Sequence, residues 1–136
     1  MSASVAVQDL VLMLLKASPD VHRLVGGNIS DGAREARVYP AVEIGPSSFF
    51  PLRMDGVVAR VESVQIDVWC RDGGKRWPCK NIVDAVVTAL DLPDGADLKD
   101  PYALTLMEVS LARVMDDRDP LTTHGVVQLD CTVETR

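Results

Sequence analysis

The sequence predicts an α+β domain in two layers, with a mainly antiparallel four-stranded sheet and two main helices packed on one face. Apolar residues recur at helical spacing near the N-terminus and again after residue 77, and elsewhere they alternate with polar residues. A strand with one apolar and one polar face needs helices on one side only. With 136 residues, the chain is expected to form a single domain spanning residues 1–136.

The N-terminal part predicts two helices. The first covers residues 4–16, where apolar side chains follow the i, i+3, i+4, i+7 pattern of one buried face, and Leu12 and Met13 widen that face. A short second helix follows Ser18, because the serine hydroxyl can accept a free backbone N–H and Pro19 fits the first helical position. The next segment is expected to be mostly irregular, with a short strand near Ile29.

The middle of the chain predicts two main strands separated by a loop. The first strand is centred on residues 41–44. Residues 45–56 are predicted to form a loop, since they contain Pro46, Pro51 and two glycines, which are typical of turns and loops. Residues 57–70 form the clearest strand, with apolar and polar side chains alternating after a bulge or strand start near Val61.

The C-terminal part predicts one helix and two strands. The helix covers residues 77–90, because Pro78 is tolerated only in a first turn. One strand places Met107, Val109 and Leu111 on the same face, and the last strand covers residues 127–134. Residues 115–125 are expected to form the polar loop of an antiparallel hairpin.

Charge and composition exclude several classes of function. A net charge of −6 disfavours non-specific attraction to nucleic acid phosphates. The longest apolar run, residues 10–15, is far shorter than the roughly 20 residues that span a bilayer, and the N-terminus lacks the features of a secretory signal. An odd number of cysteines, 3, indicates reduced thiols in a cytosolic setting.

No residue pattern predicts catalysis, a cofactor or a metal site. His22 and His124 have no partner at a fixed spacing, and His124 falls in the predicted hairpin loop. Cys70 and Cys79 lie further apart than the usual zinc-binding pair, and Cys70 and Cys131 are better explained as small buried hydrophobic residues. No phosphate-binding or nucleophile-elbow motif is present in the sequence.

The most unusual feature is the position of the 2 phenylalanines of the chain, which both lie in the predicted loop of residues 45–56. Leaving a large apolar side chain exposed costs about 1.5–3 kcal/mol. Either this segment folds back on its own domain, or it packs on another chain. Tryptophan and arginine, which are enriched where interfaces carry their energy, favour the second explanation. The predicted interface residues are Phe49, Phe50, Leu52, Met54, Trp69, Arg76 and Trp77.

The chain resembles the tail-terminator (tail-completion) proteins of long-tailed bacteriophages and gene transfer agents. The resemblance is carried, in this order, by "DLVLMLLKASPDVHRLVGGNISDG", "YPAVEIG", "ESVQIDVWCRDGGKRWPCKNIVDAVVTALD" and "DRDPLTTHGVVQLDCTVE". In such proteins a helix ending in L-V-G-G leads to an I-x-D-G turn, a strand ending in V-W precedes an alanine-rich helix, and a T-x-H-G-V hairpin leads into the last strand. The stretch "KRWPCKN" departs from the family, and no role carries over to residues 49–57.

The resemblance implies a non-enzymatic virion protein that forms a ring, commonly of six copies. The ring caps the tail tube, ends its polymerisation and joins the tail to the head-neck connector. Its partners are then other copies of the chain, the tail tube protein and the connector or stopper protein, with no membrane. The protein is expected at the tail-neck junction of the virion, after assembly in the host cytoplasm.

DNA is expected to pass through the ring without specific binding. We therefore expect the acidic surplus to face the bore or its rim, including Asp116, Asp117 and Asp119, which lack the ligand spacing of a calcium-binding EF-hand. Two alternatives stay open: a stopper or adaptor protein of the neck nearer the head, and a small-molecule-binding α+β domain. The latter predicts a deep pocket with convergent polar groups.

Overall fold

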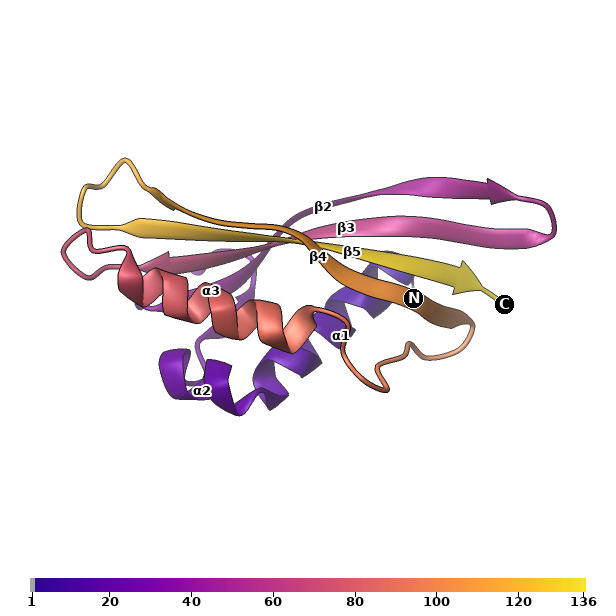
Figure 1. The fold of residues 1–136 in the computed structure, drawn as a ribbon, viewed down its shortest axis with the longest axis horizontal. Helices are drawn as coiled ribbons and strands as arrows, with labels where there is room; N and C mark the ends of the chain where they lie inside the picture. The colour runs from indigo at the N-terminus through magenta and orange to yellow at the C-terminus, as the bar shows by residue number, and fades with distance from the viewer. Residues whose placement is uncertain (1) are drawn as a thin grey trace.

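The computed structural model describes residues 2–136 as two layers, with a five-stranded sheet covered on one face by three helices (Figure 1). The strand order is β1-β2-β3-β5-β4, and all neighbours are antiparallel except β1 and β2. The predicted α+β class is confirmed, with five strands in place of four. The elements are α1 (Ala3–Ala17), α2 (Pro19–Val25), β1 (Ile29–Asp31), β2 (Ala41–Met54), β3 (Val57–Cys70), α3 (Trp77–Leu90), β4 (Tyr102–Asp116) and β5 (Thr123–Thr135).

The two predicted N-terminal helices are present, and the second begins where its capping residue predicts. The Ser18 hydroxyl accepts a hydrogen bond from the backbone N–H of Val21 and Pro19 opens α2, as expected. In α1 the inner face is buried, but Met13 is 57% exposed. The expectation that Met13 widens the buried face is therefore wrong.

The predicted loop of residues 45–56 is wrong. β2 continues through Met54 and pairs with β3 as far as Val57, and only the Asp55-Gly56 pair forms the turn. Pro46 lies at a register shift, where it interrupts no ladder hydrogen bond. Pro51 lies where β2 is an edge strand, since β1 pairs only with residues 42–44.

The short strand expected near Ile29 is confirmed as β1, and its parallel pairing with β2 makes the sheet mixed. The irregularity expected in β3 near Val61 lies instead in β2, because β3 pairs with β5 without a register shift. In β4, a register shift after Val109 turns Leu111 to the helix-free face, where it is 51% exposed. The expectation that Leu111 shares a face with Met107 is therefore wrong.

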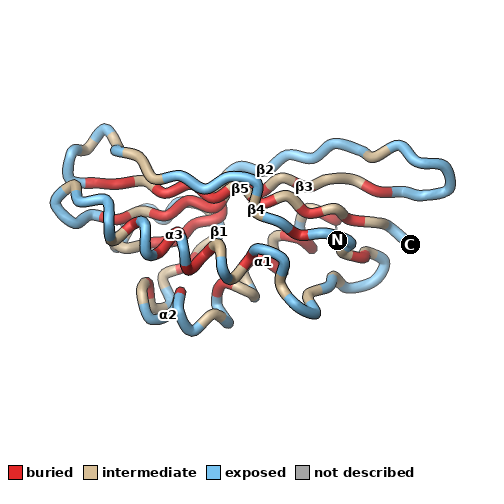
Figure 2. Tube along the Cα trace, viewed as in Figure 1, coloured by how far each residue is buried: buried red, intermediate tan, exposed pale blue. Residues whose placement is uncertain are grey.

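The core lies between the helices and the lower face of the sheet, where Figure 2 shows the buried chain. The thiols of Cys70, Cys79 and Cys131 are free and fully buried within it, as the small-hydrophobe interpretation of Cys70 and Cys131 predicts. Burial raises the pKa of the Cys131 thiol to about 12. α3 begins at Trp77, as Pro78 predicts, and packs on β5 and β4.

Candidate interaction surfaces

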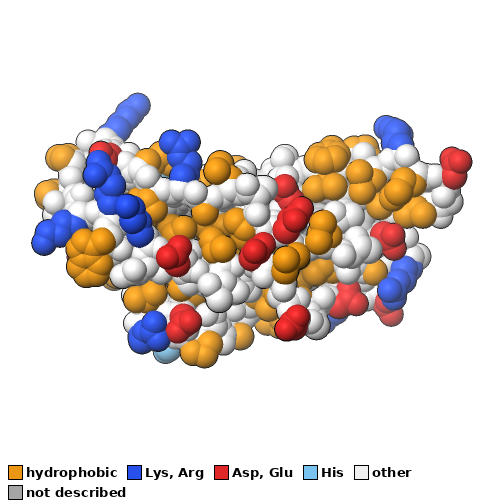
Figure 3. All heavy atoms as spheres, viewed as in Figure 1, with side chains coloured by type: hydrophobic (Ala, Val, Ile, Leu, Met, Phe, Trp, Pro, Cys, Tyr) orange, Lys and Arg blue, Asp and Glu red, His pale blue; other side chains and the backbone are white. Residues whose placement is uncertain are grey.

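The β2–β3 hairpin, called here the hairpin arm (residues 47–61), extends beyond the helical layer, and β5 pairs along its β3 strand as far as Val58 (Figure 1). Figure 2 shows its β2 strand and turn as exposed chain, and Figure 3 shows hydrophobic side chains gathered over it. Phe49 and Phe50 are 54% and 55% exposed, and Val58 is 70% exposed. The structure thus leaves both phenylalanines accessible in the single chain.

The two phenylalanines point to opposite faces of the arm. Phe49 lies opposite Glu62, and the Glu62 carboxylate accepts a hydrogen bond from Ser4 of α1, so Phe49 lies on the helix side. The Arg60 guanidinium lies 4.1 Å from the centre of the Phe49 ring. Because side chains alternate along a strand, Phe50 faces the other way. No single surface of the same domain could therefore cover both rings.

The arm presents a different set of residues on each face. Pro51 and Arg53 share the helix-side face with Phe49, whereas Leu52 and Met54 share the opposite face with Phe50. Among residues 2–136, Arg53 makes no ion pair. The predicted interface residues of this segment are therefore brought together, but on two separate faces.

Trp69 lies in a stack on the helix-free face of the sheet and is not freely exposed. Its ring stacks on His124 with centroids 3.8 Å apart, and the Arg37 guanidinium lies 4.5 Å from its centroid. His124 belongs to β5, so its placement in the hairpin loop is wrong. The position of Trp69 on the polar phase of β3 is as predicted, but other residues of the chain already cover the ring.

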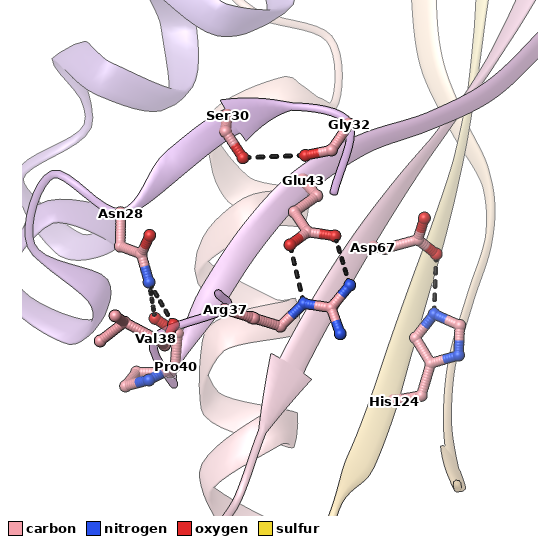
Figure 4. Close-up of polar contacts among 9 residues, drawn as sticks. All are labelled: Asn28, Ser30, Gly32, Arg37, Val38, Pro40, Glu43, Asp67 and His124. Carbon is pink, nitrogen blue, oxygen red and sulfur yellow. Dashed lines mark hydrogen bonds and ion pairs between the residues drawn. The ribbon is translucent and has the colours of Figure 1, made fainter. Parts of the chain in front are cut away.

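Buried charges hold this stack in place (Figure 4). Arg37 donates two hydrogen bonds to the Glu43 carboxylate, at 2.8 and 3.0 Å, which raise the pKa of the guanidinium although burial opposes this. His124 Nε2 lies 2.7 Å from Asp67 Oδ1. Glu43 and Asp67 are only 4% and 9% exposed. These contacts anchor the segment between β1 and β2 on the sheet, which indicates a structural role.

Arg76 and Trp77 lie at the other end of the molecule from the arm, where α3 begins (Figure 1). Trp77 is 64% exposed. Arg76 donates two hydrogen bonds to Asp116, at 3.0 and 2.8 Å. This end therefore offers a second exposed aromatic surface, separate from the arm.

The acidic residues of the β4–β5 turn are partly neutralised. Asp116 pairs with Arg76, and Asp119 lies 3.2 Å from Arg71. Asp119 also accepts hydrogen bonds from the Leu121 backbone and the Thr122 hydroxyl, which hold the pKa of its carboxyl below the usual value. Among residues 2–136, Asp117 makes no ion pair.

A groove that the sequence does not reveal lies between α1 and residues 97–99, called here the α1 groove. Its volume is about 200 Å³. Apolar side chains form most of its surface, and Asp9, Asp97 and Lys99 supply the charges around it. Its residues are Ala6, Asp9, Leu10, Met13, Asp97, Leu98 and Lys99. The only feature of the sequence that hints at this groove is Met13, an apolar residue that lies beside the main apolar stripe of α1.

One side of the α1 groove is fixed by Asp97. Its Oδ1 accepts hydrogen bonds from the backbone N–H groups of Leu104 and Leu98, at 2.9 and 2.8 Å, which hold the pKa of the carboxyl below its usual value. The Asp97 carboxyl therefore has a lower pKa in the folded protein than in the unfolded chain, where it is about 4. Its carboxylate stabilises the fold fully above that pH, and this stabilisation is lost as the pH falls through the folded-state pKa.

We expect Asp97→Asn to lower the denaturation midpoint near neutral pH by a small, measurable amount. The difference from the wild type should begin to shrink below about pH 4, where the unfolded chain takes up the proton, and should be smallest below the lower folded-state pKa, where the wild-type carboxyl is protonated in both states. Urea titrations near neutral pH and below about pH 4 measure the difference between the two proteins. Asp94→Asn in the same exposed segment is the matched control. A difference that does not change with pH would contradict the assigned role of the carboxylate.

Within residues 2–136, no group of three or more His, Cys, Asp or Glu residues is placed to hold a metal ion. Over the same part of the chain, none of the helices has the length and apolar character needed to cross a membrane. The exposed arm, the exposed Trp77 end and the α1 groove are the candidate surfaces for contacts with other chains.

Comparisons with known proteins point to one family. A family model described as "Tail completion protein gp17" matches residues 9–134. A chain from the "Virion of native gene transfer agent (GTA) particle" superposes with a TM-score of 0.84 at 22% identity, covering 98% of this chain and 99% of that chain. The gp17 protein of bacteriophage SPP1 superposes with a TM-score of 0.59 at 24% identity, covering 96% and 90%. No curated protein matches the chain. At these identities the two structures show a shared fold.

Proposed function

The chain belongs to the tail completion protein gp17 family, and from this premise we propose that it is a structural virion protein that acts as a ring of copies. The ring, of six subunits, caps the tail tube, ends its polymerisation and joins the tail to the head-neck connector. The protein works by binding and geometry, without turnover of a substrate. Its place is the tail-neck junction of the virion, and it assembles there after synthesis in the host cytoplasm.

The hairpin arm is the observation that carries this proposal. A ring requires heterologous contacts, in which one patch meets a different patch on the next subunit. The arm and the Trp77 end are two different exposed aromatic surfaces at opposite ends of one molecule. Large exposed apolar surfaces of this kind mark protein contacts, and aromatic side chains dominate the energy of such contacts.

The two faces of the arm suit two kinds of neighbour. One face can meet the next copy in the ring, and the other face can meet the stacked tail tube protein or the connector. The acidic surplus of the chain, with Asp116, Asp117 and Asp119, faces the bore or its rim, where negative charge keeps the passing DNA from binding. A virion reconstruction that placed all three carboxylates on the outside of the ring would contradict this orientation.

Size measurement of the purified protein tests the proposal. We expect either a ring of several copies, or a monomer that enters rings when tail tube protein is added. A protein that stays monomeric with and without tube protein would contradict the proposed function. If it ignores the tube protein but binds a portal or adaptor protein, it is instead a stopper or adaptor of the neck.

A further inference from the structure

We propose that the helix-side face of the hairpin arm docks in the α1 groove of a second copy of this chain. The inference rests on the proposed ring, and it names both surfaces of the contact between neighbouring subunits. It differs from a contact between the arm and the tryptophans, because Trp69 is already covered and Trp77 is itself an exposed ring.

The α1 groove has the size and chemistry of a site for one apolar side chain. Ala6, Leu10 and Leu98 line it, and Met13 stands exposed at its side. A volume of about 200 Å³ admits one phenyl ring. Filling the groove would remove its apolar surface from water, which favours binding.

The helix-side face of the arm carries the matching side chain. Phe49 is 54% exposed, and Arg60 packs over one side of its ring only. Pro51 follows it on the same face, and Val58 adds the most exposed hydrophobic side chain of the arm. A phenyl ring standing on a stiff arm, whose β3 strand is itself paired with β5 as far as Val58, loses little freedom when it binds.

The charges beside the two surfaces are complementary. Arg53 follows Phe49 and Pro51 on the helix-side face, and it has no ion-pair partner among residues 2–136. Asp9, at the side of the groove, is exposed and also unpaired over the same residues. Asp55 in the arm turn and Lys99 beside the groove form a second pair of opposite sign. Such pairs fix the register of a contact.

The occupant must be a second copy, because the arm of the same chain points away. Glu62, at the base of the arm, is bound to Ser4 in the first turn of α1. The arm continues from there past the N-terminal end of α1, whereas the groove lies further along the helix (Figure 1). The contact is therefore heterologous and can propagate from subunit to subunit.

Site-specific cross-linking tests this contact. Val58→Cys places a thiol on the helix-side face of the arm, and Met13→Cys places one at the groove. The native thiols do not interfere, since all three cysteines are fully buried. With a short bismaleimide, and with tail tube protein present, we expect neither single variant to cross-link to itself. An equal mixture of the two should give covalent dimers, and the double variant should give a ladder of multimers.

Matched variants decide the outcome. Val57→Cys lies next to Val58 but on the opposite face of the arm, so it should not cross-link to Met13→Cys. Self-cross-linking of Val58→Cys would overturn the proposal, because it shows a symmetric contact between arms. Rings of normal size without cross-links in the mixture would overturn the arm–groove contact and leave the proposed function standing. The absence of any assembly would overturn both.

A charge exchange gives an independent reading of the same contact. Arg53→Glu and Asp9→Arg should each raise the protein concentration needed for half-maximal assembly several-fold, because each puts two like charges together. The double variant should restore assembly towards the wild-type level. If the double variant is as weak as the sum of the two single variants, the two residues do not meet and the proposal fails.

Discussion

Replacing Phe49 and Phe50 together by alanine is expected to abolish ring assembly at concentrations where the wild type assembles. Central aromatic residues of an interface typically contribute about 2 kcal/mol or more, which is about 30-fold in Kd for each ring. The two rings lie on opposite faces of the arm, so the double variant weakens the contact with the next copy and the contact with the stacked neighbour. Sedimentation velocity with and without tail tube protein measures the loss.

The monomer should keep its stability in this variant. Both rings are more than half exposed, so truncation removes little buried surface, and the contact between Arg60 and Phe49 accounts for about 0.5–1 kcal/mol at most. Leu111→Ala, on the helix-free face of β4, is the matched control because its exposure is similar, 51%, and it should assemble normally. A large drop in the melting temperature with unchanged assembly would show that the phenylalanines belong to the core.

Local chemistry made most of the fold predictable. Ser18 and Pro19 determine the start of α2, and Pro78 determines the start of α3 to within a residue. The alternation in β3 and β5 correctly identifies their core faces. These signals act within a few residues of one another, and the sequence displays them directly.

The β2 strand of the hairpin arm is not predicted from the sequence, because the prolines of residues 45–56 are compatible with two kinds of structure. Pro46 and Pro51 are typical of loops, but a bulge and an edge strand accept them equally well. The opposing evidence was the Asp55-Gly56 pair, which is a strong signal for a two-residue hairpin turn between strands. The phenylalanines are exposed in the structure, and only the strand assignment shows that they face opposite ways.

The stack around Trp69 and the α1 groove depend on contacts between distant parts of the chain. Arg37 reaches Trp69, and Trp69 stacks on His124, only because β2, β3 and β5 are neighbours in the sheet. The groove exists only because residues 97–99 return beside α1. No local pattern carries this information, so neither feature could be predicted without the topology.

Gly125→Ala is expected to destabilise the protein by about 1–3 kcal/mol, the usual cost of overpacking a core. α3 lies directly against β5 at this residue. A Cβ atom there would come within 2.5 Å of Val83 Cγ2, 3.0 Å of Cys79 Sγ and 3.1 Å of Val68 Cβ. The valines are β-branched and buried, so neither can turn aside. Urea denaturation should show a lower midpoint with an unchanged m-value.

Gly27→Ala is the matched control for this test, because a Cβ at Gly27 would meet nothing within 4 Å. There the smaller entropy of the unfolded chain should leave stability unchanged or raise it by up to about 1 kcal/mol. The same entropic gain acts at Gly125, so a measured loss at Gly125 understates the packing conflict. If Gly125→Ala is as stable as the wild type, α3 can shift away from β5. The position of Trp77 at the start of α3 would then be adjustable, and that end of the molecule could not act as a rigid docking surface.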